Sequence, residues 1–342
     1  MIGTRTASWT VSVADSVQEV GRRSWTSLVE ACGAPVFYSY DFLCSVEKLP
    51  LTSPSRARYL VAREEAAGEP VAVLPVYLQH TRDPFASGPG SDALLTVLMG
   101  HVWHCYDTVL PSRVPLTAPL VEAFWTALGE LADSSDVDLW GLANVAADGE
   151  LARLLTEIGV ATESTVPRYR LPLTGGPATL DEHLTTVSRP SRRTLRQFAR
   201  RARDAGAKIT LRQGSEALDQ DVLDLCEATA DKHAPGYYPP ERLAALVNAL
   251  GPDCGILRVD LDGVLLAVSL CLYDRTRMHA WAGGCLYPRE LNWSPQYVLF
   301  AAELEAGMAS GRQVLECGRR NDEFKTRYGL HAQPLVRAAV RR

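Results

Sequence analysis

Arginine side chains are concentrated in one short segment of the chain, between residues 189 and 203. The segment contains Arg189, Arg192, Arg193, Arg196, Arg200, Arg201 and Arg203. On a helix, five of these arginines (189, 193, 196, 200 and 203) share one stripe. The opposite stripe is apolar and is formed by Leu195, Phe198, Ala202 and Ala205. Like charges three or four residues apart destabilise a helix unless something balances them, and guanidinium groups bind phosphate well. The pattern predicts a surface for phosphate or nucleic acid; a solvated face paired with acidic neighbours is the alternative.

A second candidate is the aromatic-rich segment at residues 101–107, HVWHCYD. We expect Trp103, His104 and Asp107 to line a substrate cleft. The histidines, cysteine and aspartate of this segment also suggest a metal site, but their spacing is not a known ligand set and no fourth ligand follows. The sequence therefore predicts no metal.

The composition is that of an ordinary globular protein that is long enough to bury two cores. Of 342 residues, 46% are hydrophobic and 22% are charged, and the net charge is −5. A chain with this charge has no overall attraction to nucleic acid or to an anionic membrane. Any contact with a polyanion must come from a local patch, and no DNA partner is expected.

The sequence also indicates in which cellular compartment the protein is found. The N-terminus lacks the basic start and the apolar run of a signal peptide, and no apolar stretch reaches the roughly 18 residues that cross a bilayer. The eight cysteines are scattered without a CxxC pair, which favours reduced thiols over disulfides or zinc. We expect a cytoplasmic protein without a tightly bound cofactor; the sequence does not indicate the oligomeric state.

The two halves of the chain repeat one pattern of expected elements. Each half has two strands joined at a glycine, Gly68 and then Gly263, and later a helix that leads into a short strand. These helices cover 117–132 and 295–310, and their strands cover 136–141 and 313–318. A repeat of this size indicates a duplicated domain. We assign residues 1–165 and 166–342 to the two domains, with a linker near Gly175-Gly176-Pro177 and a ligand cleft between the domains.

The other expected elements complete the order. Helices are predicted at 13–33, 38–47, 147–158, 179–187, 190–205, 216–233 and 240–249, and strands at 208–212, 255–260, 264–273 and 277–284. Helices before an antiparallel meander, then one helix and one strand, is the order of the GNAT acyltransferase core. In that core the sheet opens between its fourth and fifth strands to admit an acyl donor. This resemblance in element order implies an α/β fold class with mixed sheets, built as tandem duplicated GNAT-like domains.

The end of the chain carries a more specific resemblance. The run Leu315–Gly329, LECGRRNDEFKTRYG, resembles the closing signature of Fem-like double-GNAT proteins, a group that includes the cellulose-biosynthesis type of acyltransferase. In that signature a strand ends in Gly and is followed by an aromatic-Lys-x-Arg-aromatic run. The arginine-rich segment and Ser294-Pro295 at a helix start are similar to the same family. The first half of the chain resembles the family less closely. Its best matches are the runs FYSYDFL and PVAVLPVYL.

This resemblance implies transfer of an activated acyl group to an amine without a covalent enzyme intermediate. A backbone N–H near Gly283 would polarise the acyl carbonyl, although a glycine pair is also found at an ordinary bulge. Cations would hold the phosphates of the donor: Arg192, Arg193, Arg196, Arg200, Lys325 and Arg327. Trp281, Gly283 and Tyr328 would line the cleft with the residues of the 101–107 segment.

Three residues are candidates for proton transfer. Glu316 alternates with Leu315 and Cys317 on its strand and could point into the sheet opening as the base; a paired structural glutamate is the alternative. Tyr287 lies in the loop where the donor enters and could protonate the leaving group. His233 lies at a helix end, where it could act as acid or base or cap the helix dipole.

The donor and the acceptor stay open. Acyl-CoA-dependent GNAT enzymes carry a glycine-rich pyrophosphate loop, but residues 286–299 of this chain, LYPRELNWSPQYVL, contain no glycine. Acyl-CoA and aminoacyl-tRNA are therefore both retained as co-substrates, the latter with tRNA as partner. The acceptor is expected to be a small molecule or a cell-envelope or secondary-metabolite amine. The alternative function is a catalytically inactive double-GNAT binding or scaffold protein.

Overall fold

The chain forms two units in the computed structural model, which describes residues 9–52, 55–64, 68–85, 94–100, 105, 107–232 and 236–342. One unit contains Met1–Val166 and Pro334–Arg342, and the other contains Pro167–Gln333. The chain enters the second unit within strand β6 (Glu163–Pro172) and returns to the first within β12 (His331–Arg341). Residues 334–342, which we expected in the second domain, thus belong to the first unit.

The first unit is a mixed sheet covered by helices. Its strands are β1 (Thr10–Ala14), β2 (Ser55–Arg63), β3 (Ala72–Arg82), β4 (Leu94–Met99) and β5 (Leu139–Ala146), in the order β1-β2-β3-β4-β5-β12. β4 and β5 pair in parallel, whereas the pairs β1–β2, β2–β3, β3–β4 and β5–β12 are antiparallel. Helices α4 (Ala118–Ser134) and α5 (Glu150–Glu157) pack against one another and cover the sheet through apolar residues such as Phe124 and Leu128.

The first helix expected from the sequence is broken into three elements. Residues 13–33 contain the end of β1, α1 (Val17–Val20) and α2 (Arg22–Ala31). Gly21 separates the two helices with φ of 90°, a conformation that glycine adopts without steric cost. The next helix, α3 (Tyr40–Lys48), begins two residues later than predicted, where the Ser39 side chain caps it by accepting from the Phe42 N–H at 3.3 Å.

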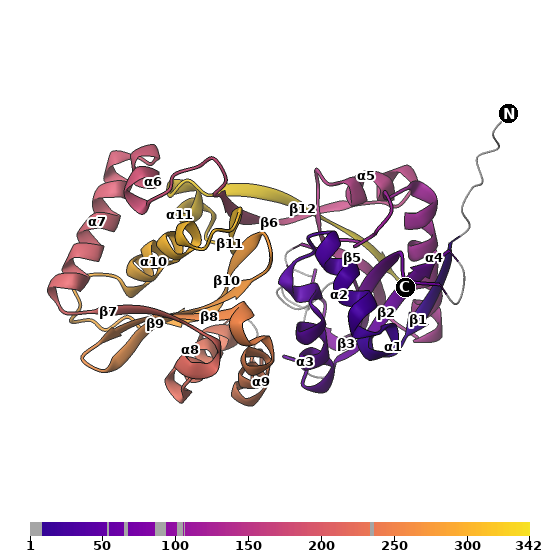
Figure 1. The fold of residues 1–342 in the computed structure, drawn as a ribbon, viewed down its shortest axis with the longest axis horizontal. Helices are drawn as coiled ribbons and strands as arrows, with labels where there is room; N and C mark the ends of the chain where they lie inside the picture. The colour runs from indigo at the N-terminus through magenta and orange to yellow at the C-terminus, as the bar shows by residue number, and fades with distance from the viewer. Residues whose placement is uncertain are drawn as a thin grey trace. The chain divides into compact units, whose positions relative to one another are not determined.

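The second unit is also a mixed sheet with helices on both faces (Figure 1). Its strand order is β6-β11-β10-β9-β8-β7, with bounds β7 (Lys208–Gln213), β8 (Cys254–Leu261), β9 (Val264–Tyr273), β10 (Arg277–Cys285) and β11 (Val314–Arg319). One face carries α6 (Leu180–Thr186), α7 (Arg189–Asp204) and α10 (Pro295–Ala309); the other carries α8 (Gln220–Asp231) and α9 (Pro240–Leu250). The short helix α11 (Asp322–Arg327) follows β11.

Helix α10 lies close against the sheet because its residues are small or apolar where they meet the strands. Val298, Leu304 and Gly307 are buried, and a Cβ at Gly307 would lie only 3.1 Å from the Leu315 side chain. On the opposite face, a Cβ at Gly284 would lie 2.4 Å from the Leu225 carbonyl oxygen of α8. The two glycines let helices approach β10 and β11 from both sides.

Strands β10 and β11 separate along their length. They pair in parallel only from Arg277↔Val314 to His279↔Glu316, although β10 continues to Cys285 and β11 continues to Arg319. Beyond that point each strand keeps its outer neighbour, since β10 pairs with β9 as far as Cys285↔Ala267 and β11 meets β6 at Arg319↔Arg168. A bulge with Trp281 as the extra residue bends β10 at the same place. The opening expected between the fourth and fifth strands of the GNAT order is present between β10 and β11, and we call it the splay.

Candidate functional site

The splay is lined on the α10 face by residues that keep some exposure to solvent. Gly283 and Cys285 of β10, Cys317 of β11 and Glu303 of α10 are all only partly buried. Leu315 and Ser269, which flank them on the same face, are buried. Partial exposure in the middle of a covered sheet indicates that the splay is accessible from solvent.

Glu303 is the acidic side chain that α10 presents to this region. Its carboxylate accepts a hydrogen bond from the Ser269 hydroxyl of β9, and it interacts electrostatically with Lys325 of α11. Burial raises the pKa of Glu303 to about 7, against the opposing effects of Ser269 and Lys325. The carboxyl group of Glu303 therefore titrates near neutral pH.

The thiols beside Glu303 are held in the neutral form. Burial and the Glu303 carboxylate raise the pKa of Cys285 to about 12, and the same two causes raise the pKa of Cys317 above its usual value. Burial and the Glu303 carboxylate also raise the pKa of Cys271 of β9. Thiols in this state are poor nucleophiles, so they contribute packing and polarity and do not form acyl-enzyme intermediates readily.

Lys325, which the resemblance placed among the cations that hold the donor's phosphates, is buried. Its side chain is 8% exposed, its ammonium donates to the Arg319 carbonyl at 2.8 Å, and the Tyr169 ring lies 5.4 Å from it. Burial lowers the pKa of Lys325 below its usual value, while Cys317 and Glu303 act against this change. Lys325 thus supplies positive charge to the inside of the splay and fixes the turn between β11 and α11.

Glu316 faces away from α10, because it alternates with Leu315 and Cys317 along β11. Its carboxylate lies 3.7 Å from Nε of Arg168, and both side chains are 5% exposed. Next to it in the parallel register is His279, which is bonded to Asp274 at 2.9 Å. This is the paired structural glutamate that the sequence left as the alternative.

The glycine pair of β10 is required by packing. A Cβ at Gly283 would lie 2.1 Å from the Val268 carbonyl oxygen of β9. Trp281 is buried and packs against Tyr238, with ring centroids 5.2 Å apart. Both residues border the splay, Trp281 through the bulge and Gly283 through its opposition to Ser269.

Tyr287 lies at the surface in the loop between β10 and α10. It is 59% exposed, and its hydroxyl donates to the Gln296 side chain at 3.1 Å. Partial burial and the neighbouring Cys285 raise the pKa of Tyr287 to about 12. The hydroxyl is therefore protonated at neutral pH, as a proton donor must be.

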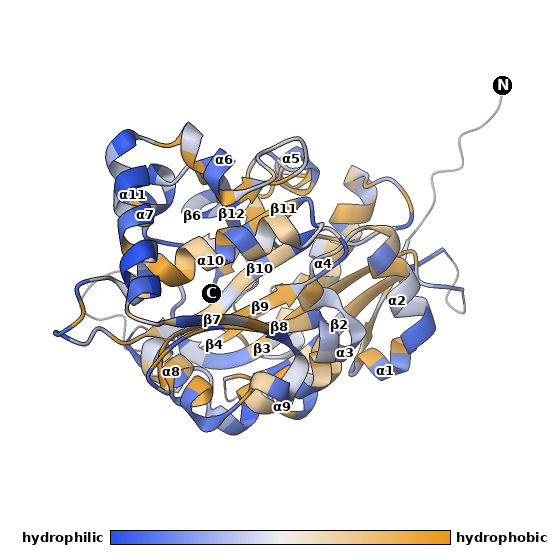
Figure 2. Ribbon diagram, turned by 60° about the vertical axis from the view of Figure 1, so that its left-hand side comes forward, coloured by the Kyte–Doolittle hydropathy of each residue, from blue (hydrophilic) through white to orange (hydrophobic). Residues whose placement is uncertain are grey.

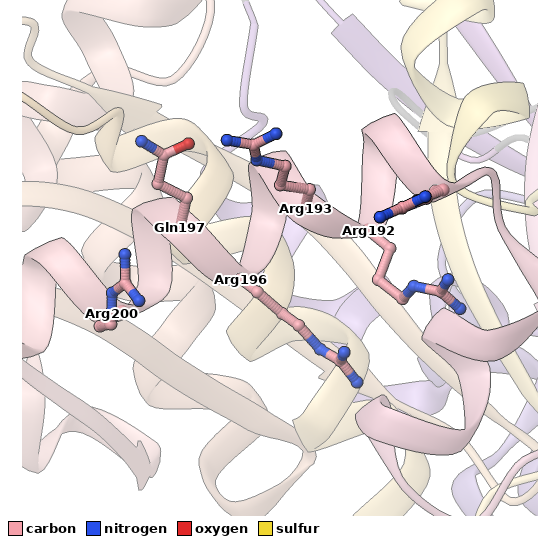
Figure 3. A pocket seen from close by; sticks show the side chains of 6 residues that line it. Arg192, Arg193, Arg196, Gln197 and Arg200 are labelled. Atoms are coloured by element: carbon pink, nitrogen blue, oxygen red, sulfur yellow. The ribbon is translucent and has the colours of Figure 1, made fainter.

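The arginine stripe on α7 lines a surface pocket of about 580 Å³ with Arg189, Arg192, Arg193, Arg196, Gln197 and Arg200 (Figure 3). Figure 2 shows α7 as a largely hydrophilic helix. The helix begins at Ser188, whose side chain accepts from the Ser191 N–H, and Leu195 and Ala202 anchor its buried face. The predicted helix and its two faces are both present.

Few of the arginines in this pocket have acidic partners. Arg196 pairs with Asp181 at 2.7 Å, and Arg192 donates to the Leu184 carbonyl at 3.4 Å. In the described parts of the chain, Arg193 and Arg200 contact no carboxylate. Most of the like charge is therefore left for an anion to neutralise, which agrees with the predicted surface for phosphate and not with a face paired to acidic neighbours.

Tyr328 anchors α7 to α11 and is not exposed. Its hydroxyl donates to the Ser191 carbonyl at 3.2 Å, and its own carbonyl contacts Nε2 of His183 at 2.9 Å. Burial raises the pKa of Tyr328 to about 12. Arg327, one residue earlier, is exposed at the surface of α11. Tyr328 thus links the arginine helix to the segment that carries Lys325.

The remaining predicted residues lie elsewhere. Trp103, His104 and His233 lie outside the described residues. Asp107 is buried in the first unit, where its carbonyl accepts from the Cys105 thiol at 3.5 Å. Across the described ranges, no group of three or more His, Cys, Asp or Glu residues could hold a metal ion. No helix within these ranges has the length and apolarity to cross a membrane.

Sequence reasoning missed Glu303, although a signal was present. The α10 sequence PQYVLFAAELEAGMA contains two acidic residues in an otherwise apolar helix. Glu303 lies four residues after Leu299 and four before Gly307, both of which are buried. That spacing places it on the sheet-facing side of the helix.

The second unit is similar to a known family. Residues 189–326, which lie within the second unit, match the family model described as an acetyltransferase (GNAT) domain. The whole chain has the fold of tandem GNAT proteins, which confirms the resemblance to Fem-like double-GNAT proteins at the level of fold.

Three solved structures illustrate this similarity. FemX is 12% identical, with a TM-score of 0.60, over 95% of this chain and 96% of its own. A tandem GNAT protein from the clavulanic acid biosynthesis pathway is 13% identical, with a TM-score of 0.57, over 97% and 98%. L-PGS from Bacillus licheniformis is 12% identical, with a TM-score of 0.54, over 96% and 92%. No curated protein matches the chain.

Proposed function

We propose that the protein is an N-acyltransferase that moves an activated acyl or aminoacyl group from a phosphate-bearing carrier to an amine. The observation that carries this proposal is the splay, where two parallel strands stop pairing after His279 and Glu316 inside a GNAT domain. Unpaired strand edges present backbone N–H groups to a carbonyl oxygen, and such donors stabilise the charge that develops there.

The arginine pocket supports a donor that carries phosphate. Arg193 and Arg200 lie two turns apart on α7, and the pocket that they share extends along the same face of the helix. Arg201 donates to the Asn292 carbonyl at 2.6 Å, which joins α7 to the loop before α10. In this proposal the carrier's phosphates bind along α7 and its acyl end enters the splay.

The neutral thiols support direct transfer. With Cys285 and Cys317 protonated, the amine itself is the nucleophile that the site favours. The relatives are compatible with either class of donor. The clavulanic acid pathway protein is named with reference to AcCoA, and another neighbour is named as a putative lysylphosphatidylglycerol synthetase. Acyl-CoA and aminoacyl-tRNA are therefore the two carriers to test.

The decisive experiment offers both carriers to the purified protein. Acetyl-CoA and a mixture of charged tRNAs are each incubated with a panel of amino acids, amino sugars and polyamines, and released thiol or deacylated tRNA is measured. Acceptor-dependent release from either carrier is expected. A protein that releases neither while still binding both carriers would instead be an inactive binding protein.

Arginine variants test how the carrier is held. Replacing Arg193 and Arg200 together with alanine should raise the KM for the carrier at least about 10-fold, because each charged hydrogen bond to phosphate contributes roughly 1.5–3 kcal/mol. The salt dependence of carrier binding should weaken as well. The control is Arg153→Ala on α5, an exposed arginine paired with Glu157 at 2.8 Å. Equal KM values for the double variant and the control would exclude the arginine pocket from carrier binding.

A further inference from the structure

Glu303 occupies a position that is costly for the fold. Helix α10 is apolar, and its two charged residues are Glu303 and Glu305, of which Glu305 is exposed. A carboxylate moved away from water destabilises a protein unless charges or hydrogen bonds compensate it. An acidic side chain kept on the sheet-facing side of such a helix therefore calls for a functional explanation.

The compensation around Glu303 is incomplete. In the described part of the chain its carboxylate has one hydrogen bond, from Ser269, and no cation within ion-pair distance. An ionised carboxylate has two oxygens and about four sites that accept hydrogen bonds. Most of these sites are free, and the side chain is only partly buried, so a donor from solvent or substrate can reach it.

The residues around Glu303 come from three strands of the sheet, β9, β10 and β11, and from α11. Ser269 and Cys271 belong to β9, Cys285 belongs to β10, and Cys317 belongs to β11. Lys325 of α11 is the one cation among the groups that act on the carboxylate. The charged and titratable groups that face Glu303 are thus three neutral thiols and one ammonium; the ionised form is favoured by the Ser269 hydrogen bond and by Lys325.

We propose that Glu303 is the proton acceptor for the amine that attacks the acyl carbon in the splay. This inference rests on the proposed acyl transfer and adds the residue that makes the amine reactive. Glu316, the other acid near the splay, faces the opposite side of the sheet and is occupied by Arg168.

The step conserves atoms and charge. The amine nitrogen forms a bond to the acyl carbon, and the bond from that carbon to the carrier's ester oxygen or thioester sulfur breaks. The nitrogen loses one proton to the Glu303 carboxylate as the amide forms. The departing oxygen or sulfur of the carrier takes up one proton and becomes a hydroxyl or thiol. This proton comes from Glu303, either directly or by exchange through solvent. No oxidant, reductant or metal takes part.

The pH dependence gives this role its signature. A base works in its ionised form, so the transfer rate should rise with pH through the pKa of Glu303, which is about 7. Lys325 lowers that pKa, so Lys325→Met should move the rising limb to higher pH. A residue with a purely structural role would change the rate without moving or removing this limb.

The test compares Glu303→Gln with Glu305→Gln. The probe reaction is transfer from the active carrier, acetyl-CoA or charged tRNA, to the amine that accepts best in the panel described above. Glu303→Gln should lower kcat by about 10²- to 10⁴-fold and remove the rising limb, as loss of a general base does. Glu305→Gln, two residues away on the exposed face, should leave kcat and the limb unchanged.

The results distinguish an error in the role of Glu303 from an error in the proposed function. If the wild-type protein transfers and Glu303→Gln keeps its rate and its pH limb, the assignment of Glu303 is wrong while the acyltransferase function stands. If the wild-type protein transfers from neither carrier, the proposed function itself fails. Circular dichroism confirms that both variants are folded, and carboxyl titration by difference infrared spectroscopy, present in the wild type and absent in Glu303→Gln, supports a titrating group near pH 7.

Discussion

Glu303 gives the second unit a pH dependence of stability that is opposite to that of most acidic residues. Its pKa is raised from an ordinary value of 4.5 to about 7 in the folded protein. Between these values the folded state binds a proton that the unfolded state has lost. The free energy of unfolding therefore falls as pH rises through this window, by at most about 3 kcal/mol.

Glu303→Gln removes this dependence, because an amide does not titrate. The variant should have a stability close to wild type below about pH 4.5 and should be the more stable protein above about pH 7. Urea unfolding at several pH values measures the difference. A difference that stays constant over this range would show that the folded-state pKa of Glu303 is not raised.

The sequence predicted some of these residues well and others poorly. Period-two alternation on β11 drew attention to Glu316, and the alternation is present, but it does not say which face the substrate meets. Strand parity places Leu315 and Cys317 toward α10 and Glu316 toward Arg168. Residue type alone also could not show that Lys325 is buried, since lysine is seldom buried in proteins.

At the scale of elements, α7 and α11 are held together by one buried hydroxyl. Tyr328 of the segment after α11 donates to the Ser191 carbonyl in the first turn of α7. Its ring packs against Phe324 and Phe300, with centroids 5.0 and 5.5 Å away. The arginine pocket and the Lys325 segment are thus mechanically connected.

Tyr328→Phe should weaken this connection without disturbing the aromatic packing. Loss of the hydrogen bond should lower the free energy of unfolding by about 1 kcal/mol. Tyr297→Phe is the matched control, because Tyr297 belongs to the same ring cluster and no hydrogen bond of its hydroxyl is found in the described residues. Chemical denaturation compares the two, and equal losses would mean that the Ser191 bond contributes nothing of its own.

Most helices and strands were predictable because their periodicity and caps agree. The predicted strand 264–273 matches β9, and the predicted helix 190–205 matches α7 within one residue at each end. Among the elements that were missed are β6, β12 and α11. The first two have no apolar alternation strong enough to mark a strand, since their residues contribute to the core at irregular positions. α11 has six residues, too few to establish a helical period.

At the scale of the whole molecule, the last strand of the chain completes the sheet of the first unit. Residues of β12 pair with β5 from Leu335↔Ala146 to Arg341↔Leu139. Gly141 lies under this strand with φ of 147°, and a Cβ there would be 2.0 Å from the Ala338 carbonyl oxygen. A contact this close requires glycine and shows that β12 is an integral strand of the first unit. Sequence order alone assigned it to the second domain.

Deleting residues 334–342 should therefore destabilise the first unit and leave the second folded. The deletion uncovers β5 and removes Ala338 from the core of the first unit. Limited proteolysis followed by mass spectrometry should show cleavage within residues 1–166 and protection of 167–333. A synthetic peptide of residues 334–342 added in trans should restore protection. Preferential cleavage of the second unit would contradict this assignment.

The return of β12 also reverses the usual sequence of events during synthesis. Domains commonly fold in the order in which they leave the ribosome. Here the segment translated first waits for its final strand until the end of the described chain has been made, whereas residues 167–333 have all their own strands earlier. The nascent N-terminal half therefore lacks one of its strands while residues 167–333 are translated, and we expect the yield of folded protein to depend on translation rate and on chaperones.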